Sequence, residues 1–320
     1  MPVCPNAILD EFMRRLRAVN ATLDRGLSAS VFGKSSLQPL VALLKTPGCT
    51  PLGIYRAIAA LEPASVDKYR DGLSYLLRGF PGLNANGIQL DDLRSQPIPQ
   101  TQAARYTRSI TPADFDPDNR RGQGIFVKPP SAFMGMSIVK YLLANPADAG
   151  LLLIHLGHAG SAGLDVRFNG RTSLEYMTSV LRVARLMGCP IAVLSMAKDG
   201  EEHLCPVLLT EFTQVPQTRR LVIHEPAFHT GTNQPAMVNF LRSRPRMIVM
   251  GFDATICVFA NVFGSEERMS PHDPTFRPPL INFADIIMSR ATLACNGPLN
   301  AKTQTFGKAE YGPLFMLGAN

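Results

Sequence analysis

The chain of 320 residues lacks the features that would place it in a membrane or direct it to secretion. No apolar run approaches the length of a transmembrane helix, about 20 residues. The N-terminal stretch MPVCPNAILDEFMRRLRAVN has no hydrophobic segment of the kind that a secretory signal contains. We therefore expect a cytoplasmic protein with no membrane partner, and export by a non-classical route, which leaves no hydrophobic mark, stays open.

Paired cysteines are also missing. The sequence has six scattered cysteines and no CxxC pair, so it can build neither a zinc ribbon nor a thioredoxin-type redox motif. In a chain of this length without a secretory signal, such cysteines are expected to be free thiols. We expect at most one of them to have a special chemical role.

A strong charge of one sign is the third absence. The net charge is +7, and charged residues make up 18% of the chain. Residues 1–150 hold 17 basic and 12 acidic residues, and the remainder hold 15 and 13. A small excess of basic residues that is spread evenly along the chain is typical of a solvated surface. We therefore expect no nucleic-acid partner. The hydrophobic content of 46% is enough for a substantial core.

The first part of the chain has helical patterns joined to an irregular stretch. Apolar residues recur at helical spacing in residues 6–26, 36–48, 50–63 and 65–82, with Thr50 and Ser65 as candidate caps. Residues 93–130 contain six prolines, which predict a connecting arm without regular structure. We therefore divide the chain into a helical extension (1–92), a Pro-rich arm (93–130) and a third domain (131–320).

The third domain alternates apolar runs with helical patterns. The sequence predicts helices over 172–188 and 234–245, and strands over 151–156, 189–196, 219–228, 246–250 and 279–288. Strands that alternate with helices form a mainly parallel sheet, and the strands here are apolar on both faces. The predicted fold class is a three-layer α/β/α domain with a helical N-terminal extension.

Cys257 is a candidate nucleophile because of its position after a predicted strand and turn. A strand ends at Met250, a glycine turn follows, and a helix is predicted to begin near Cys257. The free N–H groups of a helix N-terminus stabilise a thiolate, and they can also stabilise an oxyanion during acyl transfer. The alternative is a buried structural cysteine, which is what most free cysteines are.

This stretch resembles the nucleophile loop of the isochorismatase-like cysteine hydrolases. That loop has glycine, then threonine or alanine, then cysteine and valine, and Gly251, Ala254, Cys257 and Val258 stand at this spacing. The stretches LLLIHLG, LVIHEPAFHTGT and FADIIMSR are similar to strands of the same family, so the resemblance extends from Leu151 to about Arg290. It implies an isochorismatase-like domain, a small-molecule substrate, no cofactor and a homo-oligomer.

Two of the family's three catalytic residues are replaced. His155 stands where the resemblance implies aspartate, and Glu225 stands where it implies lysine, or His224 if the register shifts by one. A cysteine, a histidine and a carboxylate can still form a hydrolase: the imidazole accepts the thiol proton, and the carboxylate orients the imidazole. We therefore expect Cys257 to attack an amide, ester or related bond. The alternative is a catalytically inactive relative that serves as a binding or effector protein.

Several residues near these loops are candidates for binding the substrate. They are His158, Phe228, His229, Phe252, Asp253 and Ala254, with Arg167 and Arg171 as further polar candidates. A metal site built from His155, His158, His224, His229 and Glu225 is an open alternative. We expect no metal, because a HxxH spacing on a strand-to-loop segment lacks the geometry that a helix would give it.

Overall fold

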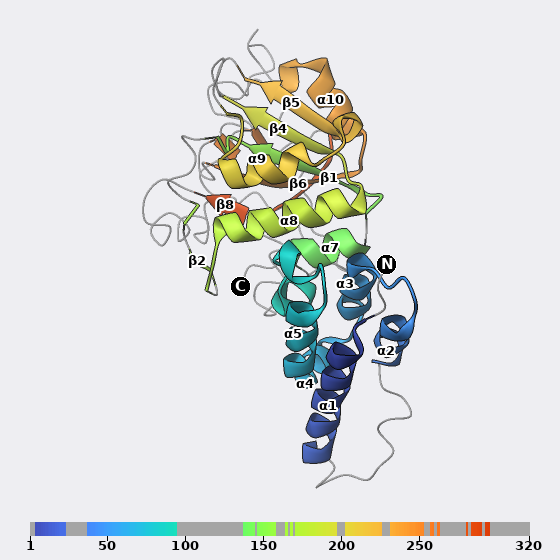
Figure 1. Ribbon diagram of the computed structural model, residues 1–320. Coiled ribbons are helices and arrows are strands. Elements are labelled where there is room, and N and C mark those ends of the chain that lie inside the picture. Colours follow the sequence, from blue (N-terminus) through green and yellow to red (C-terminus); the bar gives the residue numbers. More distant parts are fainter. Residues whose placement is uncertain are drawn as a thin grey trace.

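The computed structural model describes residues 4–23, 37–94, 137–144, 146–157, 164–165, 167–168, 170–196, 202–225, 231–252, 257–258, 261–262, 280, 283–289 and 292–294. These residues form a helical unit at the N-terminal end and an α/β unit (Figure 1). Helix α7 (Ile138–Ala144) lies between the two units, and six of its seven residues are buried. No helix in the described ranges is long and apolar enough to cross a membrane.

Within the described residues, five helices and two short 3-10 turns form the N-terminal extension. They are α1 (Asn6–Leu23), α2 (Gln38–Lys45), α3 (Pro51–Ala59), α4 (Pro63–Lys68), α5 (Arg70–Gly79), η2 (Asn84–Asn86) and η3 (Leu90–Leu93). The predicted cap of α3 is confirmed, because the Thr50 side chain accepts a hydrogen bond from the Gly53 amide at 3.1 Å. The predicted cap at Ser65 is wrong, since α4 begins earlier, at Pro63, a residue that suits a first turn. The buried Tyr69 leaves the helical conformation and divides the predicted helix over 65–82 into α4 and α5.

Six strands of the described ranges form a parallel sheet at the centre of the α/β unit. Its order is β5 (Arg220–His224), β4 (Ile191–Ser195), β1 (Ala149–Ile154), β6 (Arg246–Phe252) and β7 (Asp285–Ile287), and β8 (Leu293–Ala294) also pairs with β6. Every pairing described in this sheet is parallel. The strand predicted over 279–288 is β7, which is shorter than predicted; the predicted stretch begins with Pro279, which cannot donate to a strand ladder.

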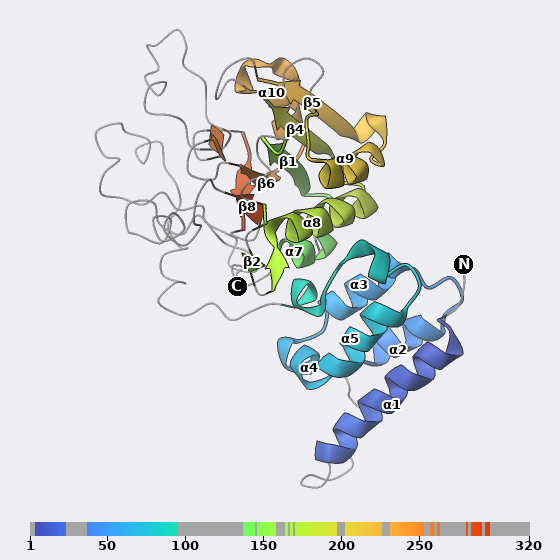
Figure 2. The same ribbon diagram turned by 60° about the vertical axis from the view of Figure 1, so that its left-hand side comes forward.

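Helices cover both faces of this sheet. α8 (Ser173–Met187) and α9 (Pro206–Thr213) lie on one face, and α10 (Pro235–Arg242) lies on the other (Figures 1 and 2). The central strands β1 and β4 are buried along their whole length, as an apolar run covered on both faces requires. The helix predicted over 172–188 is α8, and it ends at Gly188, whose φ of 77° is left-handed. The three-layer α/β/α fold is confirmed.

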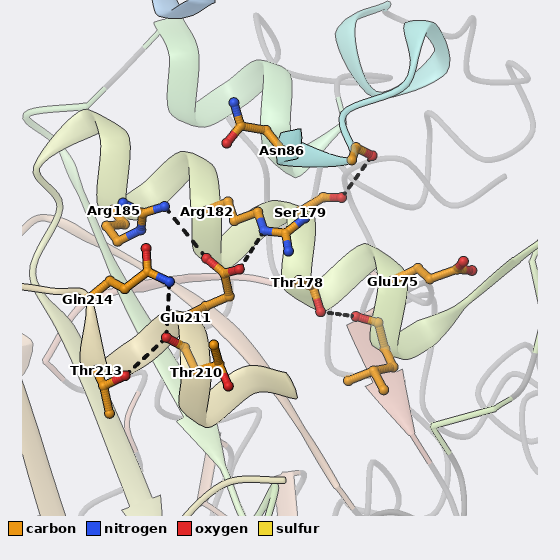
Figure 3. Close-up of polar contacts among 12 residues, drawn as sticks. Asn86, Glu175, Thr178, Ser179, Arg182, Arg185, Thr210, Glu211, Thr213 and Gln214 are labelled. Carbon is orange, nitrogen blue, oxygen red and sulfur yellow. Dashed lines mark hydrogen bonds and ion pairs between the residues drawn. The ribbon is translucent and has the colours of Figure 1, made fainter. Parts of the chain in front are cut away.

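Polar contacts hold α8 against its neighbours (Figure 3). Glu211 of α9 accepts a hydrogen bond from Arg182 Nε at 2.8 Å, and Arg185 Nη2 lies 3.6 Å from its other oxygen. On the side of the extension, Ser179 Oγ donates to the Gly87 carbonyl at 3.2 Å. α8 therefore links the helical unit to the sheet that it covers.

Arg171, which the sequence suggested for substrate binding, is part of this link. It lies on β3 (Arg171–Thr172), which forms a short antiparallel hairpin with β2 (Arg167–Phe168). Its guanidinium is buried and donates to Asp92 Oδ2 and to Ser179 Oγ, each at 2.7 Å. That prediction is wrong for Arg171, because its donors are used to join the extension to the α/β unit. The side chain of Arg167 lies outside the described part of the chain.

Candidate functional site

His155 directly follows the central strand β1. Its amide donates to the Leu194 carbonyl at 2.9 Å, which extends the pairing of β1 with β4 by one residue. Its φ of 53° is left-handed, a conformation in which histidine is several-fold enriched among non-glycine residues. Such a backbone costs on the order of 1–3 kcal/mol and is concentrated at functional sites. The side chain is 7% exposed, so the ring lies inside the carboxyl edge of the sheet.

Glu225, which follows β5, brings a carboxylate to this ring. Its Oε2 lies 2.5 Å from His155 Nε2, and its Oε1 accepts a hydrogen bond from the Gly231 amide at 2.8 Å. Its own amide donates to the Ser195 carbonyl at 2.7 Å. The side chain has no exposed surface. Both carboxylate oxygens are therefore engaged, and the carboxylate holds the ring in one orientation.

The choice between Glu225 and His224 is decided by the register of β5. Successive residues of a strand point to opposite faces of the sheet, and here Glu225 is buried while His224 is exposed. The His224 carbonyl accepts a hydrogen bond from Gln234 Nε2 at 2.5 Å. The structure therefore brings Glu225 to His155 and leaves the His224 side chain toward solvent.

Cys257 reaches the same edge because Gly251 allows a close approach. A Cβ atom at position 251 would lie 2.8 Å from the Ile154 carbonyl oxygen and 2.8 Å from Val258 Cγ2. Both distances are shorter than any that real Cβ atoms show, so only glycine lets Val258 pack against the end of β1. Cys257 and Val258 are in a π-helical turn, and Asn261 Nδ2 donates to the Cys257 carbonyl at 3.0 Å. This packing holds Cys257 next to His155, the residue that follows Ile154. Cys257 is 8% exposed.

The charge of His155 depends on both neighbours. Burial by itself lowers its pKa, but the hydrogen-bonding and electrostatic interactions with Cys257 and Glu225 outweigh burial and raise the pKa of His155 to about 9. Nε2 is engaged by Glu225. Nδ1 is buried and has no hydrogen-bond partner of ordinary geometry within the described residues. Of the two ring nitrogens, Nδ1 is therefore the one that Glu225 does not engage.

A serine and a further histidine that the sequence did not single out also lie at this edge. Ser195 ends β4, between β1 and β5, and is 1% exposed. Its Oγ is 3.1 Å from Nδ1 of the half-buried His203. A polar residue at the carboxyl end of a buried strand was a usable signal for Ser195. His203 belongs to a loop segment, and no spacing in the sequence connects it to the site.

The other candidate binding residues fall into two groups. Phe252 is half-buried at the end of β6 and packs against the core. His158, Phe228, His229, Asp253 and Ala254 lie outside the described residues. Of the five residues considered for a metal site, the structure describes the side chains of His155, His224 and Glu225. His224 is exposed. Across the described ranges there is no group of three or more side chains that could hold a metal ion.

Comparisons with known proteins add only distant likenesses. The chain matches no protein-family model, and no curated protein sequence matches it. Among solved structures, the MAR1 ribonuclease of Caenorhabditis elegans is similar over 54% of this chain and 78% of its own, with 15% identity and a TM-score of 0.39. The YcaC gene product of Escherichia coli, an octameric hydrolase of unknown specificity, is similar over 59% of this chain and 79% of its own, with 12% identity and a TM-score of 0.39. At these TM-scores neither likeness bears on activity, and the fold class rests on the strand order and the helices described above.

Proposed function

We propose that this protein is a cysteine-dependent hydrolase or acyl-transfer enzyme that acts on an amide, ester or related bond of a small molecule. Cys257 is the nucleophile, His155 is its proton partner, and Glu225 orients and charges the imidazole. The observation that supports this most is the contact of Glu225 Oε2 with His155 Nε2, which keeps Nδ1 as the ring nitrogen available to Cys257, a neighbour whose interactions raise the pKa of His155. A nucleophile, a base and a group that orients the base are the three parts that such chemistry needs.

The acylation step uses these groups in order. Before the substrate binds, the Cys257 thiol has given its proton to His155 Nδ1, in keeping with the raised pKa of His155, and the imidazolium is stabilised by the Glu225 carboxylate. The thiolate sulfur attacks the carbonyl carbon, and the oxygen becomes an oxyanion. When the carbonyl re-forms, the C–N or C–O bond breaks, and the imidazolium returns its proton to the leaving amine or alcohol. An acyl–Cys257 thioester remains, to be transferred to water or to another acceptor.

A retired active site is the competing candidate. Cys257, His155 and Glu225 are each less than a tenth exposed, and the family resemblance implies an aspartate and a lysine that this chain does not have. In that case the fold, with the helical extension packed on it, would serve in binding alone. Self-association and the identity of the substrate stay predictions in either case.

The experiment that separates the two candidates is a screen of chromogenic esters and anilides with the full chain and with Cys257→Ser. Hydrolysis that is lost in Cys257→Ser supports the proposal. Cys205→Ser is the matched control, because it makes the same sulfur-to-oxygen replacement in another buried cysteine, the one that precedes α9. This variant is expected to retain hydrolysis. No hydrolysis of any substrate, or equal hydrolysis by Cys257→Ser, would favour the binding protein.

A further inference from the structure

Two arginines lie at the amino edge of the sheet, opposite the edge that carries His155 and Glu225. Arg219 stands directly before β5, and Arg244 stands two residues before β6. Cys189 leads into β4, which lies between β5 and β6 in the strand order. Because the strands are parallel, these strand starts meet at one edge of the sheet. The five residues of β4 separate it from the other edge by about 16 Å.

The side chains of both arginines reach the turn at Gly188 and Cys189. The Arg219 guanidinium lies over Gly188, where a Cβ atom would come within 3.0 Å of its Nη1. Burial raises the pKa of Cys189 to about 11, and the charges of Arg244 and Arg219 are near enough to the thiol to oppose this rise. Cys189 is fully buried, whereas both arginines are half-buried. A solute can therefore reach the two positive charges without reaching the thiol.

Within the described residues, neither of these guanidiniums has a carboxylate partner. Arg244 Nε is buried and has no acceptor in these ranges, and its Nη1 donates to the carbonyl of the preceding residue, Ser243, at 3.2 Å. Asp148, which precedes β1 at the same edge, is engaged by Arg246 at 3.0 Å. The charges of Arg219 and Arg244 are thus left without an anion among the side chains that the structure describes.

The fold around the turn does not need this pair of charges. The amides of Gly188 and Cys189 already donate to the last carbonyls of α8, at 3.1 and 2.9 Å, so these carbonyls do not depend on Arg219. Two like charges gathered at one turn repel each other, and a buried N–H group without an acceptor costs free energy. An anion bound between the two guanidiniums would remove both costs.

We propose that Arg219 and Arg244 form a binding site for a phosphoryl oxyanion, either inorganic phosphate or the phosphate group of a small ester. A guanidinium presents a fixed fork of donors that matches the oxygens of a phosphate. A phosphate group carries about 1.5 to 2 negative charges at pH 7, which two arginines neutralise. The site lies at the edge of the sheet away from Cys257, so this inference does not rest on the proposed function.

Isothermal titration calorimetry of the full chain with inorganic phosphate, at neutral pH and fixed ionic strength, tests the inference. We expect one equivalent of phosphate to bind saturably. Arg219→Gln and Arg244→Gln should each weaken this binding by about 10-fold or more, because each removes charge-assisted hydrogen bonds. Arg220→Gln and Arg242→Gln are the matched controls, since each removes a neighbouring arginine that lies over a phenylalanine ring, and both should bind phosphate like the unaltered protein.

Two further titrations locate the site and identify the source of the phosphoryl group. Cys257→Ser should bind phosphate like the unaltered protein, whether or not the protein is a hydrolase. Weaker binding by Cys257→Ser would place the anion at the catalytic edge and overturn the inference. Glycerol 3-phosphate should compete with inorganic phosphate, and the ligand that binds more tightly shows whether the site is built for an ester or for the free ion.

The inference is overturned if neither phosphate nor glycerol 3-phosphate binds saturably, or if Arg219→Gln and Arg244→Gln bind phosphate as tightly as the unaltered protein. If a glutamine variant does not fold, Arg219→Lys and Arg244→Lys carry the same test. Lysine keeps the charge but not the fork of donors, so these variants should weaken binding by a smaller factor. Unchanged binding in both lysine variants would likewise count against the site.

Discussion

Replacing His155 with asparagine is expected to change how the stability of the protein depends on pH. Asparagine tolerates the left-handed backbone at this position, so the substitution removes the titrating ring with little added strain. The pKa of His155 in the folded protein is raised to about 9, and an unperturbed histidine has a pKa of about 6.5. Because the folded value is the higher one, protonation of His155 stabilises the folded state.

The direction and size of the effect follow from this difference. The contribution is fully present below about pH 6.5 and is lost as the pH rises to about 9. A difference of about 2.5 pKa units, at about 1.4 kcal/mol per unit, gives about 3.5 kcal/mol as an order-of-magnitude value. The ring is 7% exposed, so screening by solvent removes little of it.

Urea denaturation at intervals from pH 6 to pH 10 measures this contribution. The free energy of unfolding of the unaltered protein, minus that of His155→Asn, should fall by about 3.5 kcal/mol across that range. His224→Asn, which replaces an exposed histidine at the end of β5, is the control for the loss of any imidazole. A difference that is constant with pH, or one that grows as the pH rises, would refute the assignment of a protonated His155 in the folded state.

Two further predictions concern the packing that builds the site. Gly251→Ala should lower the free energy of unfolding by about 1–3 kcal/mol in urea titrations, because the added methyl group meets the Ile154 carbonyl and Val258. In the same variant, Cys257 should be alkylated more slowly. An unchanged alkylation rate would contradict the close approach. Asp92→Asn should cost about 3–5 kcal/mol, because it leaves the buried Arg171 without its carboxylate. Asp91→Asn is the matched control and should cost no more than about 1 kcal/mol, since its ion pairs are exposed; equal losses for the two variants would show that the buried pair is not special.

The sequence was sufficient for the main elements of the α/β unit. Apolar runs such as Leu151–Ile154 identified strands covered on both faces, and Gly188 identified the end of α8. The division of the helix at Tyr69 was not predictable, because both halves have helical spacing and the break depends on how Tyr69 packs in the core.

The candidate site was predictable only in part, because several of its contacts depend on how segments pack in the folded chain. Strand ends and the nucleophile-like turn indicated His155, Glu225 and Cys257, but the choice of Glu225 over His224 needed the register of β5. The role of Arg171 depends on Asp92, which is far away in the sequence. His203 meets Ser195 only because the loop before α9 folds back over the end of β1. Such contacts between distant segments leave no periodic pattern in a single sequence.

The most direct test of the central claim is the rate at which iodoacetamide alkylates Cys257 at neutral pH, measured by mass spectrometry against the other cysteines. Burial is the largest influence on the pKa of Cys4, Cys49, Cys189 and Cys205 and raises it in each case, so these thiols are expected to react slowly. If His155 and Glu225 activate Cys257, it should react well ahead of these four, and His155→Asn should remove most of that advantage. If Cys257 reacts no faster than the four buried thiols, or if His155→Asn leaves its rate unchanged, the three residues do not form a working catalytic set.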